Sequence, residues 1–188
     1  MTEATMEYNL YFQPGFEWKK GGKLPGLCGG ECPRGCTTTR GNGWSARLMW
    51  QQNGGISTYV YWPEMPNSGC GVQFLWDKTL ETGVWYNITT YVKMNTPGVK
   101  NGVAKGYVNG KLVFTKSDFK WVEDAAVGKR ITFAYITTYA GGKSVEQFAP
   151  SKTQYLKCDF SQSMCIVKTS FSCDHQSYII SAVNKTSK

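Results

Sequence analysis

Residues 44–62, WSARLMWQQNGGISTYVYW, decide the fold, because they hold two short apolar and aromatic runs separated by a turn signal. The runs 44–51 and 56–62 have the length and residue types of strands, and Asn53-Gly54-Gly55 marks a turn between them. In a strand, side chains two positions apart share a face. We therefore expect an antiparallel hairpin with one polar and one apolar face. The core-facing positions are Ala46, Leu48 and Val60.

The turn determines which polar side chains meet across this hairpin. With direct strand pairing, Arg47 lies opposite Tyr59 and Ser45 lies opposite Tyr61. Such pairing needs a loop with an odd number of residues, since a two-residue turn would put each pair on opposite faces of the sheet. Gly55 lengthens the turn and favours the odd loop. Taken alone, two tyrosines and an arginine on a sheet more often form a packed cation–π surface than an active site.

The rest of the chain repeats this pattern of short strands and glycine-rich turns. We expect further strands at 8–18, 72–76, 85–94, 105–108, 111–114, 130–139 and, as the last, 153–160. Asn109-Gly110 is the strongest hairpin signal, residues 19–43 read as loop, and only 118–126 could hold a short helical turn. The sequence thus predicts an all-β fold, an antiparallel β-sandwich (jelly roll) of two stacked sheets with a concave cleft. We assign residues 1–160 to this domain and 161–188 to a C-terminal extension.

Composition limits the partners without choosing one. The 188 residues carry a formal net charge of +8, which attracts polyanions such as nucleic acid, anionic polysaccharide or anionic lipid. The basic residues form no block like a nucleic-acid-binding tail, and no nucleic-acid-binding motif is present. No stretch approaches the roughly 20 apolar residues of a membrane span. We therefore expect neither a nucleic acid nor a membrane as partner.

Seven cysteines indicate disulfides rather than a metal site. The spacing Cys28-x3-Cys32-x3-Cys36 lacks the x2 step of common zinc motifs, and the one histidine, His175, is far along the chain. We expect at least one disulfide in the 28–36 loop, and hence an oxidising compartment. Two glycosylation sequons agree with secretion, although the first residues show no signal peptide.

The stretch GGKLPGL, residues 21–27, places Lys23 between glycines and a Leu-Pro-Gly turn. A lysine in such a segment is usually a solvated loop residue. However, GGKLPGL, WSARLMW and STYVYWP follow one another in an order that resembles polysaccharide lyase family 14, the alginate and glucuronan lyases. The similarity runs from about Tyr8 to Phe160 and includes VNGK at 108–111 and YAGG at 139–142.

This resemblance implies a jelly roll whose cleft is lined by five functional residues: Lys23, Ser45, Arg47, Tyr59 and Tyr61. It also implies cleavage of a polyuronate, either alginate of the mannuronate type or glucuronan, by a secreted monomer. The chain departs from the family at Cys28, in the loop 31–43 and at QFLWDK, residues 73–78. These departures bear on the substrate range more than on the reaction, because the five polar positions are intact.

β-Elimination explains why these residue types are needed. A base removes the C5 proton of a uronate, an enolate-like intermediate forms, and the C4 oxygen leaves. Arg47 and Lys23 can neutralise the carboxylate and stabilise the growing negative charge. We expect these cations to lower the pKa of Tyr59 and make it the proton-transfer residue, as base and as acid. Tyr61 would assist, and Lys23 is the alternative base because nearby cations would lower its pKa too.

Two further positions are expected to bind sugar: Ser45 at the reacting uronate and Lys143 at a neighbouring one. The chemistry needs no metal or cofactor. The competing function is a non-catalytic carbohydrate-binding module on the same sandwich, whose aromatic strips and basic face would look alike. A β-domain that binds nucleic acid is a more distant alternative, suggested by charge alone.

Overall fold

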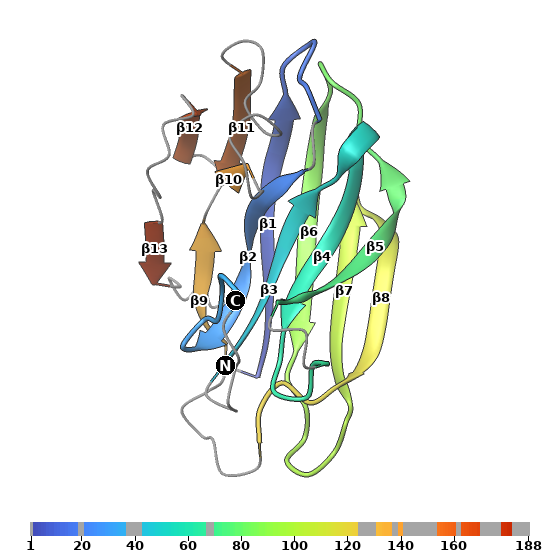
Figure 1. Cartoon of the computed structure of the whole chain (residues 1–188), viewed down its shortest axis with the longest axis vertical. Coiled ribbons are helices and arrows are strands. Elements are labelled where there is room, and N and C mark those ends of the chain that lie inside the picture. The colour runs from blue at the N-terminus through green and yellow to red at the C-terminus, as the bar shows by residue number, and fades with distance from the viewer. Residues whose placement is uncertain are drawn as a thin grey trace, which may run out of the picture.

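The computed structural model describes residues 2–18, 21–36, 43–66 and 70–123, and the strands that follow them. Two antiparallel sheets lie face to face (Figure 1). The six-stranded sheet contains, in spatial order, β12 (Ser163–Thr169), β11 (Gln154–Phe160), β1 (Glu3–Phe12), β6 (Trp85–Lys93), β7 (Gly102–Val108) and β8 (Lys111–Phe119). The seven-stranded sheet contains β13 (Tyr178–Ser181), β9 (Ile131–Ile136), β2 (Gly22–Gly30), β3 (Gly43–Trp50), β4 (Gly55–Tyr61) and β5 (Val72–Thr79), with β10 (Tyr139–Ala140) also paired to β2.

The predicted sandwich is confirmed, and helix is almost absent from the described residues. They hold one helical turn, the 3-10 turn Gln52–Gly54 between β3 and β4. No helix among them is long and apolar enough to cross a membrane. Residues 118 and 119, expected in a helical turn, instead end β8, and positions 124–126 lie outside the described residues.

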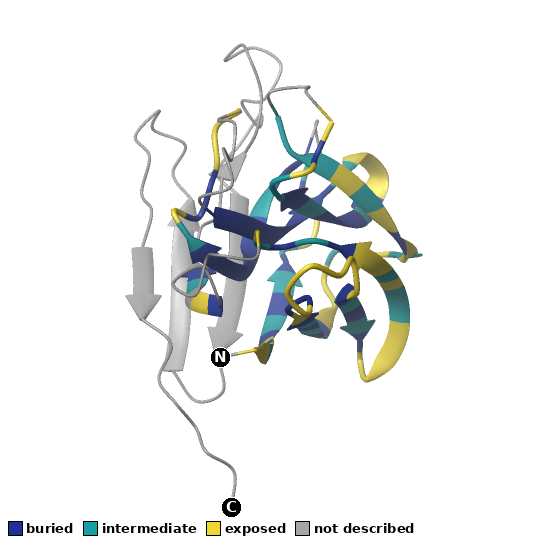
Figure 2. Cartoon of the chain, turned by 90° about the horizontal axis from the view of Figure 1, so that it is seen from below, coloured by how far each residue is buried: buried dark blue, intermediate teal, exposed yellow. Residues whose placement is uncertain are grey.

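The core lies between the sheets and follows the two-residue period of the strands. On β3 and β4, Ala46, Leu48 and Val60 are 0–4% exposed and belong to the main apolar cluster, as predicted. Large aromatic side chains fill the space between the layers, and Trp44 packs against Trp121 with ring centroids 4.9 Å apart. Figure 2 shows this buried layer between the two sheets. The polar alternate positions of β3 and β4 therefore face away from the core.

Strand β2 corrects the sequence analysis, which expected residues 19–43 to be loop. Residues 22–30 form an inner strand, paired with β3 on one side and β9 on the other. Proline lacks an N–H and is tolerated in such a strand at a bulge, and the β2–β3 register shifts between Leu24 and Gly26, around Pro25. Tyr8 of the facing sheet donates from its OH to the Pro25 carbonyl at 3.5 Å. The Pro-Gly signal thus marks a bulge within a strand, and contacts with the other sheet stabilise that bulge.

Other boundaries differ in detail. Strand β1 spans Glu3–Phe12 rather than 8–18. The Asn109-Gly110 hairpin is confirmed, with φ angles of 51° and 75° at the two turn residues, the left-handed pair of a type I′ turn. Residues 153–160 are not the last strand, since β12 and β13 follow. The division into a domain at 1–160 and an extension at 161–188 stays a prediction.

Two disulfides confirm the expectation for the 28–36 loop. Cys28 pairs with Cys32, and Cys36 pairs with Cys70 in the connection between β4 and β5. The second bond links segments 34 residues apart in the sequence. Closing a loop of that length stabilises a fold by about 4 kcal/mol in the chain-entropy model. Residues 32–36, the described end of the loop after β2, are therefore held by a disulfide at each end.

Candidate active site

Strand pairing brings the five expected residues onto the outer face of the seven-stranded sheet. Arg47 lies opposite Tyr59, and Ser45 lies opposite Tyr61, in the predicted register. The loop is odd, because Trp50 pairs with Ile56 and residues 51–55 connect them. Lys23 joins the group from β2, where it lies opposite Met49 of β3.

The close approach of β2 to β3 depends on a glycine next to Arg47. Gly26 pairs with Arg47, and a Cβ at Gly26 would collide with the carbonyl oxygen of Ala46 and with the Arg47 Cα. Any other residue would therefore separate the two strands that carry the cations. This requirement accounts for the glycine after Pro25 in the Lys-Leu-Pro-Gly sequence.

Lys23 is a partly buried amine held against an aromatic ring. Its Nζ lies 3.6 Å from the centroid of the Tyr59 ring and 2.6 Å from the Met49 Sδ. Burial, and then the charge of Arg47, lowers the pKa of Lys23 from 10.5 to about 7. The expectation that nearby cations would lower this pKa is confirmed, although burial contributes more. A substantial fraction of Lys23 is neutral at neutral pH.

Tyr59 behaves in the opposite way to the sequence prediction. We expected the neighbouring cations to lower its pKa, but burial and then its hydrogen bond with Tyr61 raise the pKa well above 10.0. The two hydroxyl oxygens are 3.3 Å apart. Arg47 does lower the pKa of Tyr59, but by less than burial raises it. Tyr59 is therefore a neutral phenol that can donate a proton.

Arg47 is a buried cation without a neighbouring carboxylate in the described residues. It is 5% exposed, and its Nε has no hydrogen-bond partner there. Burial lowers the pKa of Arg47, and the groups that modify it further are tyrosines and Arg34. Burying a guanidinium costs free energy unless each of its N–H groups donates to an acceptor. The site therefore favours an anionic ligand.

The disulfide-bonded loop holds the other two polar residues. Ser45, which is 1% exposed, donates from Oγ to the Pro33 carbonyl at 2.8 Å. The backbone N–H of Cys36 donates to the Tyr61 hydroxyl at 3.1 Å. Both side chains are thus oriented by one loop. Lys143, the expected contact to a neighbouring sugar, lies outside the described residues.

Three residues of the site escaped the sequence analysis: Met49, Gln73 and Tyr135. The Tyr135 ring, on β9, lies 4.9 Å from the Arg47 guanidinium carbon and 5.9 Å from that of Arg34. Gln73, on β5, pairs with Tyr59 and donates from Nε2 to the Met49 Sδ at 3.5 Å. Met49 could have been predicted, because residues 45, 47 and 49 of one strand point to the same face.

Comparison with known proteins identifies the family and agrees with the fold. A family model described as Polysaccharide lyase 14 matches residues 1–161, whereas no curated protein sequence matches the chain. The solved structure of alginate lyase Aly36B is 27% identical, with a TM-score of 0.72 over 84% of this chain and 67% of that one.

Two further structures show likeness in fold. The PL-14 alginate lyase from Aplysia kurodai is 24% identical, with a TM-score of 0.73 over 84% of this chain and 67% of that one. The endo-beta-1,4-glucuronan lyase from Trichoderma reesei is 15% identical, with a TM-score of 0.57 over 90% of this chain and 69% of that one.

Proposed function

The chain belongs to polysaccharide lyase family 14 and is a polyuronate lyase, and we propose that it cleaves its polymer with Lys23 as the base and Tyr59 as the acid. The observation that supports this assignment is the pair of opposite pKa shifts within one contact. The Lys23 amine has a pKa near 7, while the Tyr59 phenol that it touches has its pKa raised. Of the two alternatives left open by the sequence, these shifts favour Lys23 as the base.

Arg47 makes the C5 proton acidic enough to remove. A uronate carboxylate that accepts hydrogen bonds from the guanidinium loses much of its charge, and the enolate that forms next places still more charge on the same oxygens. A preorganised cation stabilises that state most. The free Nε of Arg47 and the absence of a carboxylate partner within the described site leave this donor ready for the substrate.

The elimination then balances between two side chains. The neutral Lys23 Nζ takes the C5 proton, the C4–C5 double bond forms, and the C4–O4 bond breaks with its electron pair on O4. The Tyr59 hydroxyl protonates O4, and the resulting phenolate lies beside the new Lys23 ammonium. The hydrogen bond from Tyr61 helps to stabilise that phenolate. Ser45 and Tyr61 otherwise position the sugar.

The placement of the base and the acid favours one stereochemistry. Lys23 and Tyr59 are in contact on one face of the sheet, so they approach the substrate from the same side. In mannuronate and glucuronate residues the C5 hydrogen and the C4 oxygen leave in a syn relation, whereas guluronate requires an anti relation. The favoured substrate is therefore mannuronate-rich alginate or glucuronan.

The site of action that fits is extracellular. Two disulfides tie the loop that orients Ser45 and Tyr61, and such bonds persist in oxidising compartments. A secreted monomer that acts on a soluble or wall-bound polymer is consistent with these two disulfides.

Incubation with mannuronate-rich alginate, guluronate-rich alginate and glucuronan, followed by ultraviolet absorbance of the unsaturated ends, tests the function. We expect turnover on the first or the last, and kcat/KM that rises with pH through about 7 as Lys23 loses its proton. Retention of the polymer without any unsaturated product would instead indicate the binding-module alternative. A rate that rises only near pH 10, where an ordinary tyrosine ionises, would assign the base to Tyr59.

A further inference from the structure

Arg34 is a cation at the site to which the proposed reaction assigns no role. Its guanidinium carbon lies 5.9 Å from the centroid of the Tyr135 ring, and that of Arg47 lies 4.9 Å from the same centroid. The two guanidiniums are therefore no farther apart than these two distances added together, which is about the span of two linked hexuronate units. Arg47 is buried, whereas Arg34 is exposed.

The backbone around Arg34 is held at several points. A disulfide involves the cysteine at each end of residues 32–36. The φ angles of these two cysteines are 45° and 62°, in a region that residues other than glycine adopt only where the surrounding structure fixes them. The carbonyl before Arg34 accepts a hydrogen bond from Ser45, and the N–H two residues after it donates to Tyr61. Arg34 is therefore presented by a preorganised segment beside the reacting groups.

Two cations beside one ring match the charge pattern of a polyuronate. Burial, and to a smaller extent the charge of Arg34, lowers the pKa of Arg47, so the two side chains repel each other when no anion is bound. In the proposed reaction, Arg47 takes the carboxylate of the uronate that is cleaved. A polyuronate carries one carboxylate on every unit, so the next carboxylate along the polymer is the anion that fits Arg34.

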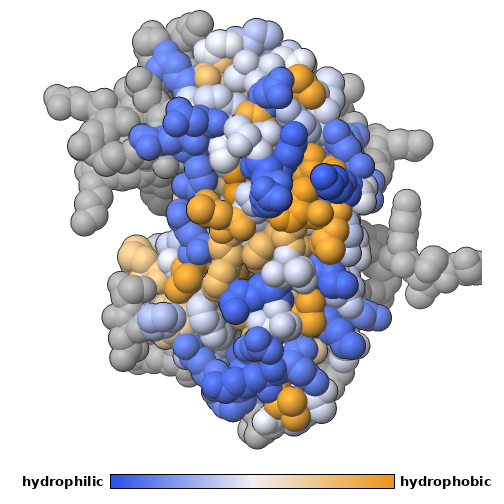
Figure 3. Space-filling view, turned by 90° about the vertical axis from the view of Figure 1, so that its right-hand side faces the viewer, coloured by the Kyte–Doolittle hydropathy of each residue, from blue (hydrophilic) through white to orange (hydrophobic). Residues whose placement is uncertain are grey.

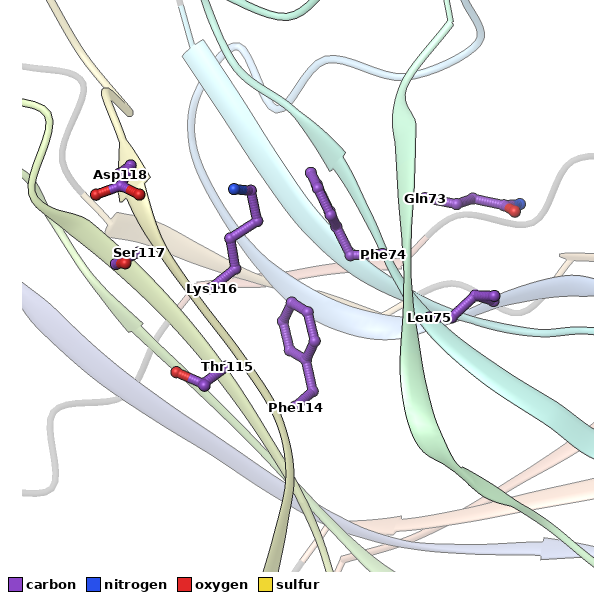
Figure 4. A pocket seen from close by; sticks show the side chains of 8 residues that line it. All are labelled: Gln73, Phe74, Leu75, Phe114, Thr115, Lys116, Ser117 and Asp118. Carbon is purple, nitrogen blue, oxygen red and sulfur yellow. The ribbon is translucent and has the colours of Figure 1, made fainter.

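Positive charge away from this site also attracts the polymer, because the chain carries a formal net charge of +8. Lys116 of β8 lines a hollow at the edge of the sandwich, and its Nζ lies 5.4 Å from the Phe74 ring (Figure 4). Seen from that edge, apolar side chains gather between hydrophilic ones (Figure 3). Lys105 lies on the six-stranded sheet, beside Tyr91. Variants of these two lysines therefore separate a specific role of Arg34 from attraction by net charge.

We propose that Arg34 binds the carboxylate of a uronate that adjoins the reacting one, so that the enzyme prefers at least two consecutive ionised uronates. Arg34 acts in binding and not in the elimination step, because the charge that develops there stays on the carboxylate at Arg47. Arg34 lies in the loop 31–43, one of the segments that depart from the family and bear on the substrate range. This inference rests on the proposed function, since it assumes that Arg47 holds the reacting uronate.

Removal of the Arg34 charge provides the first test. Arg34→Gln should raise KM on mannuronate-rich alginate about threefold to fivefold, the upper range for an exposed ion pair, with kcat within about twofold of wild type. Lys105→Gln and Lys116→Gln remove the same charge elsewhere and should leave KM unchanged. An unchanged KM in Arg34→Gln, an equal or larger rise in either lysine variant, or a loss in kcat rather than in KM would overturn the proposal.

A polymer that contains some neutral units provides the second test. Reduction of part of the carboxylates of polymannuronate, with carbodiimide and borohydride, converts those uronates into mannose units. Mass spectrometry of the unsaturated products from wild type should find the ratio of uronate to mannose raised at least about twofold over that of the polymer, at one of the two positions that adjoined the reacting unit. Arg34→Gln should lose most of this enrichment, whereas Lys116→Gln should keep it.

The outcomes of this second test separate the proposal from the lyase function. Mannose units distributed at random in the products of wild type, or the same enrichment in Arg34→Gln, would overturn the proposal while leaving the lyase function intact. Absence of unsaturated products from the unreduced polymer would overturn the lyase function itself.

Discussion

Two lysine–tyrosine pairs occupy opposite outer faces of the sandwich, and we propose a catalytic role for only one of them. On the seven-stranded sheet, the Lys23 Nζ lies 3.6 Å from the Tyr59 ring centroid; on the six-stranded sheet, the Lys105 Nζ lies 5.8 Å from that of Tyr91. The Tyr91 hydroxyl donates to Glu3 at 2.7 Å, and this bond raises the pKa of Tyr91 to about 12.

The difference lies in burial and in the counter-charge. Tyr91 has an acidic partner and lies on an exposed face, so the pair is neutralised and solvated. Lys23 and Tyr59 are partly buried, and their charged neighbour is another cation, Arg47. The same two residue types therefore form a surface contact in one place and, in the other, the partly buried pair that we propose as base and acid. Removing matched residues from each pair measures that difference.

The largest effect is expected from the two lysines. Lys23→Ala removes the proposed base and should lower kcat about 100-fold to 10,000-fold, the usual contribution of a general base. Lys105→Ala should change turnover less than twofold, because surface substitutions away from the site rarely have a large effect. Initial rates of ultraviolet absorbance on mannuronate-rich alginate measure both. Near-normal turnover in Lys23→Ala would show that Lys23 and Tyr59, like Lys105 and Tyr91, form only a packing contact.

The two tyrosines should differ somewhat less. Tyr59→Phe keeps the ring under Lys23 but removes the transferable proton, and kcat should fall about 100-fold to 1,000-fold. Tyr91→Phe loses only the bond to Glu3 and should retain full activity. Binding of the polymer, measured by affinity electrophoresis, should survive in both variants. A Tyr59→Phe enzyme that keeps its rate would assign protonation of the leaving group to water.

Arg47→Lys keeps the positive charge but loses the planar guanidinium, which can donate two hydrogen bonds to one carboxylate. Hydrogen bonds to charged groups contribute about 1.5–3 kcal/mol, so kcat/KM should fall about 10-fold to 150-fold. The matched change on the six-stranded sheet is Lys105→Arg, which should be neutral. Steady-state kinetics at saturating and limiting polymer separates the loss in kcat from the loss in KM. A loss confined to KM would mean that Arg47 only binds the sugar.

The smallest effect concerns stability. The pKa of Lys23 is lower in the folded state than in the unfolded chain, so the unfolded chain binds more protons between about pH 7 and 10.5, and stability rises with pH across that window. Lys23→Met should therefore unfold at a higher temperature than wild type at about pH 6, by a few degrees, with a gap that closes towards about pH 10. Lys105→Met is the control for thermal unfolding by circular dichroism. A gap that does not change with pH would contradict the lowered pKa.

Much of the site could be predicted from local pattern. The two-residue period of strands and the odd turn were sufficient to place Arg47 opposite Tyr59 and Ser45 opposite Tyr61. These relations span a single hairpin, so no distant part of the chain decides them. The core positions of the same hairpin follow from the same period.

What the sequence could not provide comes from contacts between distant segments. Residues 22–30 were mistaken for loop because Pro25 and its glycines are loop signals, and the bulge that accommodates them is completed by Tyr8 from the other sheet. Tyr135 enters the site only because β9 pairs with β2. The pKa of Tyr59 was predicted in the wrong direction because the sequence displays neighbouring charges but not burial, and burial is the larger effect.

The loop after β2 has a practical consequence for anyone who prepares the protein. The cystine at Cys36 and Cys70 fixes the backbone N–H that holds the Tyr61 hydroxyl, and the same loop accepts the hydrogen bond of Ser45. We expect expression in a reducing host, or storage with a thiol, to open that loop while the sandwich core keeps its packing. Such a preparation would pass a test of folding and still report a slow enzyme, so the choice of host and buffer belongs to the assay itself.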